Sequence, residues 1–277
     1  MKRACVIGWP ISHSRSPLIH GHWLQRYRID GSYTREAVKP EDAGEFLRNL
    51  AAHGFVGCNV TVPHKETAFA IADVVQESAR AVGAANTIWL DGGKINAANT
   101  DTYGFMTNLA TEAADWEAGG KPVLLLGAGG AARAIAYGFL EAGVGEVRIA
   151  NRTRERAEAL AAHFGSRITV VDWEQRSQAA RDAGVLVNTT TIGMKGEGDL
   201  GIDLSGMAAS AVVADIVYVP LETKLLADAR ARGLRAVDGL GMLLHQAVPG
   251  FEKWFGVRPA VTPELRAIIV ADIEAQH

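Results

Sequence analysis

The feature that most constrains the fold of this chain is an alternation of short apolar, β-branched runs with alanine-rich helical stretches along most of its length. Repetition of strand, helix and strand is the pattern of a mainly parallel sheet with helices on its faces. The sequence therefore predicts an α/β fold. Because the 277 residues exceed the usual size of one domain and 48% of them are hydrophobic, we expect two domains with separate cores.

The first part of the chain carries predicted strands, helices and one hairpin. The predicted strands are residues 4–8, 33–38 and 56–62, and the predicted helices are residues 17–27, 40–53 and 65–75. The segments 86–90 and 94–98 flank Asp91-Gly92-Gly93, a sequence that readily adopts the positive φ of a tight turn. These two segments therefore predict a β-hairpin.

A second unit begins with the apolar run 123–126, which stops at Gly127. Comparable runs follow at residues 147–150, 168–171, 185–187 and 212–216, with predicted helices at residues 131–142 and 153–164. An apolar strand, a glycine-rich turn and a helix, repeated in this way, are typical of a doubly wound nucleotide-binding sheet.

Charge and targeting features exclude several classes of protein. A net charge of -3 provides no broad positive surface for a nucleic-acid backbone or an anionic membrane. The apolar run at the N-terminus is broken at Gly8 and Pro10, too early for a signal peptide, and no segment approaches transmembrane length. Cys5 and Cys58 lie in apolar runs without C-x-x-C spacing, which predicts buried, reduced thiols. We therefore expect a cytoplasmic protein with a small-molecule partner.

The turn after the first strand of the second unit is the candidate phosphate loop. It reads Gly127, Ala128, Gly129, Gly130 and Ala131 and opens a predicted helix. Glycines allow backbone N–H groups to approach a pyrophosphate, and the helix N-terminus favours its negative charge. The loop departs from G-x-G-x-x-G, and a plain tight turn is the alternative. Its position between a strand and a helix favours a dinucleotide site.

The end of the next strand selects the cofactor. An NAD site usually carries an acidic residue there to bind the ribose 2′-hydroxyl. This chain instead has Asn151, Arg152, Thr153, Arg154, Glu155 and Arg156. A guanidinium at Arg152 can pair with a 2′-phosphate, which predicts NADP(H). The alternative is that the arginines form the solvated first turn of a helix, but cations there oppose the helix dipole and call for a compensating anion.

Lys65 and Asp101 stand out in the first part of the chain. Pro63 suits the first position of a helix, which would place Lys65 in the first turn, where the dipole disfavours a cation. A solvated surface lysine is the alternative. Asp101 has the plainer interpretation of an N-cap for a helix that begins near Thr102. Hydroxyl and amide side chains beside the strands, such as Ser14 and Asn86, suit a hydroxylated ligand but are also common in turns and caps.

Nine short motifs, in order along nearly the whole chain, give the sequence a family resemblance. They are P-I-S-H-S-R-S-P (10–17), G-C-N-V-T-V-P-H-K (57–65), A-A-N-T (84–87), N-T-D (99–101), G-A-G-G-A (127–131), N-R-T (151–153), N-T-T-x-x-G-M (188–194), D-x-x-Y-x-P (215–220) and D-G-x-x-M-L-x-x-Q (238–246). With these motifs the chain resembles the shikimate dehydrogenase family. Together they are far more specific than the glycine loop alone.

The resemblance implies a domain organisation and a role for each matching residue. It implies a substrate domain from residues 1–102, completed by C-terminal helices from 239–277, and a Rossmann-like NADP domain from 103–238, with the active site in the cleft between them. Lys65 and Asp101 match the catalytic pair. The matching substrate contacts are Ser14, Ser16, Asn59, Thr61, Asn86, Tyr218 and Gln246. The matching cofactor contacts are Gly127 to Ala131, Asn151 to Arg156, Glu77, Ile216, Gly239 and Met242.

Two positions depart from the family pattern. Ser12 stands where glycine is common, which leaves the local loop conformation open, and Ile216 stands where methionine is common, which preserves apolar character. Neither position carries the expected chemistry.

The function that the resemblance implies is reversible, NADPH-linked reduction of 3-dehydroshikimate to shikimate, in chorismate and aromatic amino-acid biosynthesis, by a monomer or homodimer. Two alternatives stay open. One is a quinate or broad quinate/shikimate dehydrogenase, and the other is a non-catalytic NADP-sensing protein of the same fold. The histidines show no H-E-x-x-H pattern and G-x-S-x-G is absent, so we expect neither a metal site nor a nucleophilic hydrolase.

Overall fold

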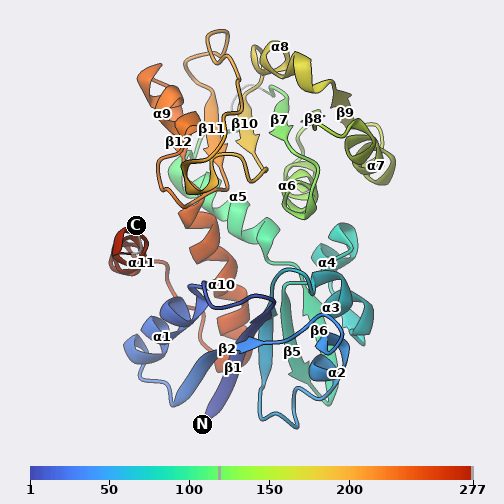
Figure 1. Cartoon of the computed structure of the whole chain (residues 1–277), viewed down its shortest axis with the longest axis vertical. Helices are drawn as coiled ribbons and strands as arrows, with labels where there is room; N and C mark the ends of the chain where they lie inside the picture. The colour runs from blue at the N-terminus through green and yellow to red at the C-terminus, as the bar shows by residue number, and fades with distance from the viewer. Residues whose placement is uncertain (118–119, 276–277) are drawn as a thin grey trace. The chain divides into compact units, whose positions relative to one another are not determined.

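The chain forms two compact α/β units in the computed structural model, which describes residues 1–117 and 120–275 (Figure 1). The first unit comprises Met1–Tyr103 and Leu244–His277, and the second comprises Gly104–Leu243. The sequence predicts domain boundaries after residues 102 and 238. The two units of the structure are divided after residues 103 and 243. In the part of the chain that is described, no helix is both long enough and apolar enough to cross a membrane.

The first unit is built on a mixed sheet with the strand order β2-β1-β3-β5-β6-β4. Its strands are β1 (Lys2–Gly8), β2 (Gly31–Ala37), β3 (Gly57–Val60), β4 (Val74–Val75), β5 (Thr87–Asp91) and β6 (Lys94–Ala98). Its helices are α1 (Ser16–Arg26), α2 (Ala43–Arg48), α3 (Lys65–Ile71), α4 (Glu77–Val82) and α11 (Pro263–Ala275). Strand β1 is parallel to β2 and β3, whereas β5 is antiparallel to both β3 and β6. The predicted strands and hairpin are therefore confirmed.

The predicted helix over residues 65–75 is wrong in its C-terminal part. Helix α3 ends at Ile71, and Val74–Val75 form a short strand beside β6. Asp73 decides this change, since its backbone N–H donates to the carbonyl of Ile95 at 2.8 Å and its carboxylate accepts from the Ile95 N–H at 2.8 Å. Pairing with a distant strand thus overrides the local helical pattern. The predicted helix over residues 40–53 is likewise shorter, since α2 spans only Ala43–Arg48.

The two faces of the first sheet bury different kinds of side chain. Cys5, Cys58 and Ile88 belong to the aliphatic core that also contains residues of α2 and α3, and both thiols are free and buried, as predicted. On the opposite face, the ring of Trp254 lies so close to the strand that a Cβ on Gly57 would approach its indole nitrogen to 2.1 Å. The indole N–H donates to the carbonyl of Ile88 at 2.8 Å. Glycine at position 57 is therefore required for this packing.

The second unit contains a parallel sheet with the strand order β12-β11-β10-β7-β8-β9. Its strands are β7 (Val123–Leu126), β8 (Val147–Ala150), β9 (Ile168–Val171), β10 (Val185–Asn188), β11 (Val212–Asp215) and β12 (Arg235–Val237). Its helices include α6 (Gly130–Glu141), α7 (Arg154–Phe164), α8 (Arg176–Ala180) and α9 (Lys224–Ala231), while α5 (Asp101–Glu112) and α10 (Leu240–Phe255) each have residues in both units. The order reverses between β7 and β10, which confirms the doubly wound prediction.

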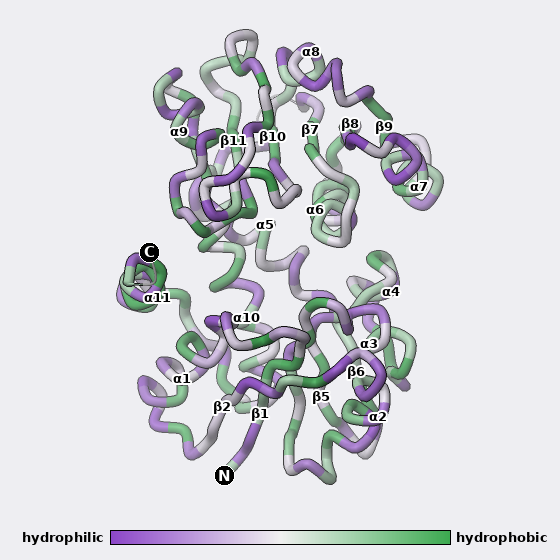
Figure 2. The backbone as a smooth tube through the Cα atoms, viewed as in Figure 1, coloured by the Kyte–Doolittle hydropathy of each residue, from purple (hydrophilic) through white to green (hydrophobic). Residues whose placement is uncertain are grey.

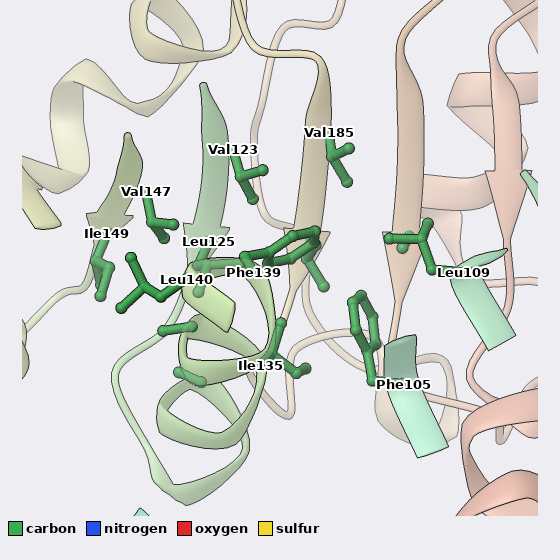
Figure 3. Close-up of a cluster of buried hydrophobic side chains, with 14 of the residues drawn as sticks. Phe105, Leu109, Val123, Leu125, Ile135, Phe139, Leu140, Val147, Ile149 and Val185 are labelled. Atoms are coloured by element: carbon green, nitrogen blue, oxygen red, sulfur yellow. The ribbon is translucent and has the colours of Figure 1, made fainter. Parts of the chain in front are cut away.

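Burial on both faces explains why the central strands β7, β10 and β11 are almost continuous hydrophobic runs. In Figure 2 strands β7, β10 and β11 are largely hydrophobic and α8 is largely hydrophilic. Figure 3 shows Ile135 and Phe139 of α6 beside side chains of β7 and Phe105 of α5. The rings of Phe105 and Phe139 meet edge to face with centroids 5.7 Å apart. This core holds the glycine turn after β7 in a fixed place.

An aromatic cluster against the first sheet contains the buried histidine His20. Its side chain is fully buried, its ring stacks on Tyr33 with centroids 4.0 Å apart, and neither ring nitrogen has a hydrogen-bond partner among the described residues. Burial lowers the pKa of His20 to about 3 from its ordinary value of 6.5. The imidazole is therefore neutral in the folded protein at neutral pH, whereas the unfolded chain binds a proton near pH 6.5.

This histidine should make the first unit acid-sensitive. Because the folded-state pKa is lowered, the stabilising contribution is complete above pH 6.5 and is lost as the pH falls from 6.5 towards 3. We expect the His20→Phe variant to lose less free energy of unfolding than the wild type between pH 7 and pH 4, by on the order of 3 kcal/mol. Urea unfolding at both pH values measures this difference, with the exposed His53→Gln as control. Equal losses in His20→Phe and wild type would contradict the assignment.

Candidate active site

The polar motifs of the first unit meet at one edge of its sheet. Strands β1 and β3 end at this edge, and β5 begins there because it runs antiparallel to β3, with Asn59 paired to Thr87. Strand β6 returns to the same edge, where Ala98 pairs with Thr87. The segments that follow β1, β3 and β6 and precede β5 are therefore brought together, although they lie far apart in the sequence.

Lys65 and Asp101 form an ion pair at this edge. The Nζ atom of Lys65 lies 2.5 Å from Oδ2 of Asp101, and the exposed fractions of the two side chains are 30% and 15%. Lys65 is the first residue of α3, after the N-cap His64. The expectation that Pro63 opens the helix is wrong, because residues 61–64 form a turn closed by the His64 N–H on the Thr61 carbonyl at 2.9 Å. The expectation that Lys65 lies in the first turn is confirmed.

Asp101 is held on both sides of its carboxylate. Lys65 donates to Oδ2, and the Nδ2 group of Asn86 donates to Oδ1 at 2.8 Å. Asp101 is also the first residue of α5, and its backbone N–H donates to Oδ1 of Asn99 at 3.0 Å. The carboxylate therefore does more than mark the start of a helix. It joins the lysine to the amide of Asn86.

The serine loop after β1 is braced by two arginines that sequence reasoning did not single out. The hydroxyls of Ser14 and Ser16 lie 3.3 Å apart. Arg35 donates through Nε and Nη2 to the Ser14 carbonyl at 2.8 and 2.5 Å. The buried guanidinium of Arg15 pairs with Asp272 of α11 at 2.8 Å. Two hydroxyls beside fixed positive charge suit a carboxylate ligand.

The remaining substrate candidates differ in burial and in the hydrogen bonds that their side chains already form within the protein. Asn59 is buried, accepts from the Tyr33 hydroxyl at 2.6 Å and donates to Thr87 and to the Asn86 carbonyl, both at 3.2 Å. Thr61 is half-buried directly after β3, and Gln246 is half-buried on α10 in the same unit. Asn59 thus uses its amide within the protein, whereas Asn86 joins the ion pair directly.

Tyr218 lies in the second unit, on the loop after β11. Asp215, at the end of β11, orders this loop because its carboxylate accepts from the Val217 N–H at 2.9 Å and the Thr223 hydroxyl at 2.7 Å. Asn188 donates to the same carboxylate at 2.9 Å. Burial raises the pKa of Asp215 to about 6. The D-x-x-Y spacing therefore places the tyrosine on a loop held by a buried acid.

The turn after β7 has the geometry of a phosphate-binding loop. Gly127 has φ +113°, and a Cβ there would meet the Thr189 hydroxyl at 2.6 Å, so only glycine fits. Gly129 is the N-cap of α6, and a Cβ added at Gly129 or Gly130 would meet no atom within 4 Å. No side chain of the N-cap competes for the first turn of this long helix. The loop therefore offers backbone N–H groups beside open space, which fits a pyrophosphate.

The arginines after β8 have different surroundings. Arg154 forms ion pairs with Glu158, at 2.8 Å, and with Asp172. The guanidinium of Arg152 lies 5.6 Å from the ring centroid of Trp173, and among the described residues neither Arg152 nor Arg156 has an ion pair. Asn151 closes the turn by donating to the Thr153 carbonyl at 2.7 Å. Of these three arginines, only Arg154 is paired with a carboxylate in the part of the chain that the structure describes.

The other cofactor candidates fall into two groups. Ile216, Gly239 and Met242 lie in the second unit, where Ile216 and Met242 pack on the core around β7. A Cβ on Gly239 would approach the Ile216 carbonyl oxygen to 2.3 Å, so these two segments meet only because position 239 is glycine. Glu77 begins α4 in the first unit, where Arg80 lies 3.6 Å from its carboxylate.

Family models match most of the chain. The shikimate dehydrogenase substrate binding domain matches residues 6–88, the shikimate / quinate 5-dehydrogenase model matches residues 108–193, and the shikimate 5'-dehydrogenase C-terminal domain matches residues 239–264.

Individual relatives match over nearly their full length. The shikimate dehydrogenase (NADP(+)) of Azorhizobium caulinodans is 54% identical over 276 residues, which cover 100% of this chain and 98% of the relative. The crystal structure of shikimate 5-dehydrogenase from Thermus thermophilus in complex with NADP(H) and shikimate is 35% identical, with a TM-score of 0.87 and coverage of 99% and 100% of the two chains. Quinate dehydrogenase from Corynebacterium glutamicum in complex with NAD is 30% identical, with a TM-score of 0.88 and coverage of 98% and 99%. By its motifs, its fold and these relatives, the chain belongs to the shikimate dehydrogenase family.

Proposed function

We propose that this chain catalyses the reversible, NADPH-linked reduction of 3-dehydroshikimate to shikimate in chorismate and aromatic amino-acid biosynthesis. Residues 1–102 and 239–277 hold the substrate, and residues 103–238 hold NADP(H). The observation that carries the proposal is the 2.5 Å contact of Lys65 with Asp101 beside Asn86 and the serine loop. We further propose that the protein works in the cytoplasm as a monomer or homodimer.

Lys65 is the acid–base group of the proposed reaction. NADPH, when bound, supplies the hydride that reduces the ring ketone. The ammonium of Lys65 stabilises the negative charge that develops on the ketone oxygen and donates a proton to it, and in the oxidising direction the neutral amine accepts that proton. Asp101 orients Lys65 through their ion pair and is itself oriented by the Asn86 amide. Proton transfer is thus assigned to residues of one unit.

The substrate contacts follow from the chemistry of the ligand. The hydroxyls of Ser14 and Ser16, beside Arg35, donate to the carboxylate. The ring hydroxyls are assigned to polar groups at or near the same edge, together with Tyr218 of the second unit. These groups are Asn59, Thr61, Asn86 and Gln246.

The cofactor assignment rests on two features of the second unit. The glycine loop before α6 fits a pyrophosphate, and Ile216, Gly239, Met242 and Glu77 are assigned to the rest of the cofactor. Arg152 stands where an NAD site usually carries an acid, and no carboxylate of the described chain pairs with it. A guanidinium in this place favours NADP(H) over NAD.

A second candidate function is quinate or broad quinate/shikimate dehydrogenase activity, favoured by the fold shared with the Corynebacterium quinate dehydrogenase. A spectrophotometric assay with shikimate and quinate, each offered with NADP and NAD, separates the candidates. We expect shikimate with NADP to give the highest kcat/KM. Quinate turnover as fast as shikimate turnover would favour the second candidate. Absence of turnover with all four combinations would favour a non-catalytic NADP-binding protein.

Arg152→Ala should raise the KM for NADP while leaving the KM for NAD nearly unchanged, because only NADP carries the 2′-phosphate. Loss of a charge-assisted hydrogen bond of about 1.5–3 kcal/mol corresponds to an increase of roughly 10- to 150-fold. Arg230→Ala, which removes an exposed arginine on α9, is the matched control. Equal increases for both cofactors in Arg152→Ala would show that the arginine supports the fold instead.

Lys65→Ala should lower kcat by roughly 10²–10⁴, the usual range for general acid–base catalysis, while the KM for shikimate changes much less. Asp101→Asn should also lose activity, and the double variant should be little worse than the more damaging single one, because the pair acts as a unit. Lys94→Ala, at the exposed start of β6 beside the hairpin turn, provides the control. Near-normal turnover in a folded Lys65→Ala protein would remove the lysine from this role.

A further inference from the structure

A row of buried hydrogen-bonding side chains crosses one face of the first sheet and ends at the catalytic pair. Tyr33 of β2, Asn59 of β3 and Thr87 of β5 lie on the same face, since Asn59 is paired directly with Thr87 across the strands. All three are at most 8% exposed. Asn86 precedes β5 and connects this row to Asp101. A row of this kind is not needed to fill a core, because apolar side chains would do so without hydrogen-bonding requirements.

The orientation of the Asn86 amide is determined by a backbone donor. The N–H of Thr100 lies 2.8 Å from Oδ1 of Asn86, and a backbone N–H can only donate. The carbonyl end of the amide must therefore face Thr100, and the NH₂ end must face Asp101. A flipped amide would place an oxygen against the carboxylate of Asp101 and an NH₂ group against the Thr100 N–H. Both contacts would be repulsive.

The hydroxyl of Thr87 completes this arrangement. It lies 3.1 Å from Oδ1 of Asn86 and 3.1 Å from the hydroxyl of Thr100, which is itself 3.1 Å from the same Oδ1. Whether Thr87 donates directly or through Thr100, the hydrogen bonds point towards Oδ1 of Asn86. Asn59 donates through Nδ2 to the Thr87 hydroxyl at 3.2 Å, so the hydrogen of that hydroxyl is left for Asn86 or Thr100.

The hydrogen bonds at the other end of the row, between Tyr33, Asn59 and Thr87, also point in one direction. The Tyr33 hydroxyl donates to Oδ1 of Asn59 at 2.6 Å, which leaves the NH₂ end of Asn59 facing Thr87. Burial raises the pKa of Tyr33 well above its ordinary value, so the phenol keeps its proton and remains a donor. Hydrogen bonds that point the same way strengthen one another.

We propose that Thr87 is a positioning residue for catalysis, the centre of a directional chain of hydrogen bonds from Tyr33 through Asn59, Thr87 and Asn86 to Asp101. No proton moves along this chain. The Thr100 N–H sets the orientation of the Asn86 amide, and the Thr87 hydroxyl at Oδ1 restrains the amide further in the position from which it donates to Asp101, which in turn holds Lys65. The inference rests on the proposed function for its kinetic consequences, but the amide orientation itself is independent of any activity.

The first test replaces the hydroxyl of Thr87 at constant shape. Thr87→Val should lower kcat for NADPH oxidation with 3-dehydroshikimate by about tenfold, the effect expected for one buried hydrogen bond, while the KM for NADPH stays unchanged. Thr87→Ser keeps the hydroxyl and should retain most of the wild-type kcat. A purely structural role would instead lower the melting temperature of Thr87→Val without lowering kcat per folded molecule, and that result would overturn the proposal.

The second test removes the first donor of the chain and keeps its ring. Tyr33→Phe should lower kcat several-fold, because Oδ1 of Asn59 loses its donor and the amide of Asn59 is no longer held. Tyr27→Phe is the matched control, since its hydroxyl accepts from the Ala260 N–H at 3.0 Å in the same unit, outside the chain. Equal kcat values for both variants would contradict the proposal. Tyr33→Phe also decides the matter if Thr87→Val does not fold.

A third measurement separates this inference from the proposed function. In the substrate-free protein, the side-chain amide ¹H and ¹⁵N signals of Asn86 should shift or split in Thr87→Val and stay close to wild type in Thr87→Ser. Unchanged Asn86 signals in Thr87→Val would refute the chain even if the enzyme is active. If the wild-type protein fails to oxidise NADPH with 3-dehydroshikimate, the proposed function is wrong, and the signals still decide whether Thr87 holds Asn86.

Discussion

The ion pair between Lys65 and Asp101 depends on the mixed character of the first sheet. Lys65 follows β3, and Asp101 follows β6. Because β5 runs antiparallel to β3 and β6 runs antiparallel to β5, the end of β6 returns to the edge where β3 ends. The hairpin thus brings the aspartate to the lysine. It also places Asn86 on the other side of the aspartate, where its amide donates to Oδ1 while Lys65 donates to Oδ2.

In the second unit, a purely parallel sheet positions the proposed cofactor site. All its strands are parallel, so every strand ends at the same edge, and the order reverses between β7 and β10. Ligands of such sheets bind at that switch point, where Gly127 turns away from β7 against Thr189 of the neighbouring strand's loop. The proposed phosphate loop therefore needs no side-chain chemistry of its own. It needs glycine, backbone N–H groups and a helix that starts there.

Prediction from sequence was more accurate for the second unit than for the first, for a physical reason. Residues 123–126, 147–150 and 168–171 were predicted as strands with the bounds that the structure has, because each is a short run dominated by aliphatic residues that ends at a polar residue or glycine. In the first unit, the helix predicted over residues 65–75 ends early, since Asp73 pairs with Ile95. Local periodicity carries no information about such a distant partner.

The sequence by itself determined which chemistry stands at each strand end: the hydroxyls of Ser14 and Ser16, the cation of Lys65, the carboxylate of Asp101, and an arginine at position 152 where an acid would favour NAD. Its motifs were specific enough to identify the family. Only the tertiary structure decided which groups are partners. The pairing of Arg15 with Asp272 joins residues 257 positions apart, and the amide of Asn86 takes its direction from the Thr100 N–H. Neither follows from residue type, because hydrogen-bond direction and ion pairing depend on where the folded backbone places each donor and acceptor.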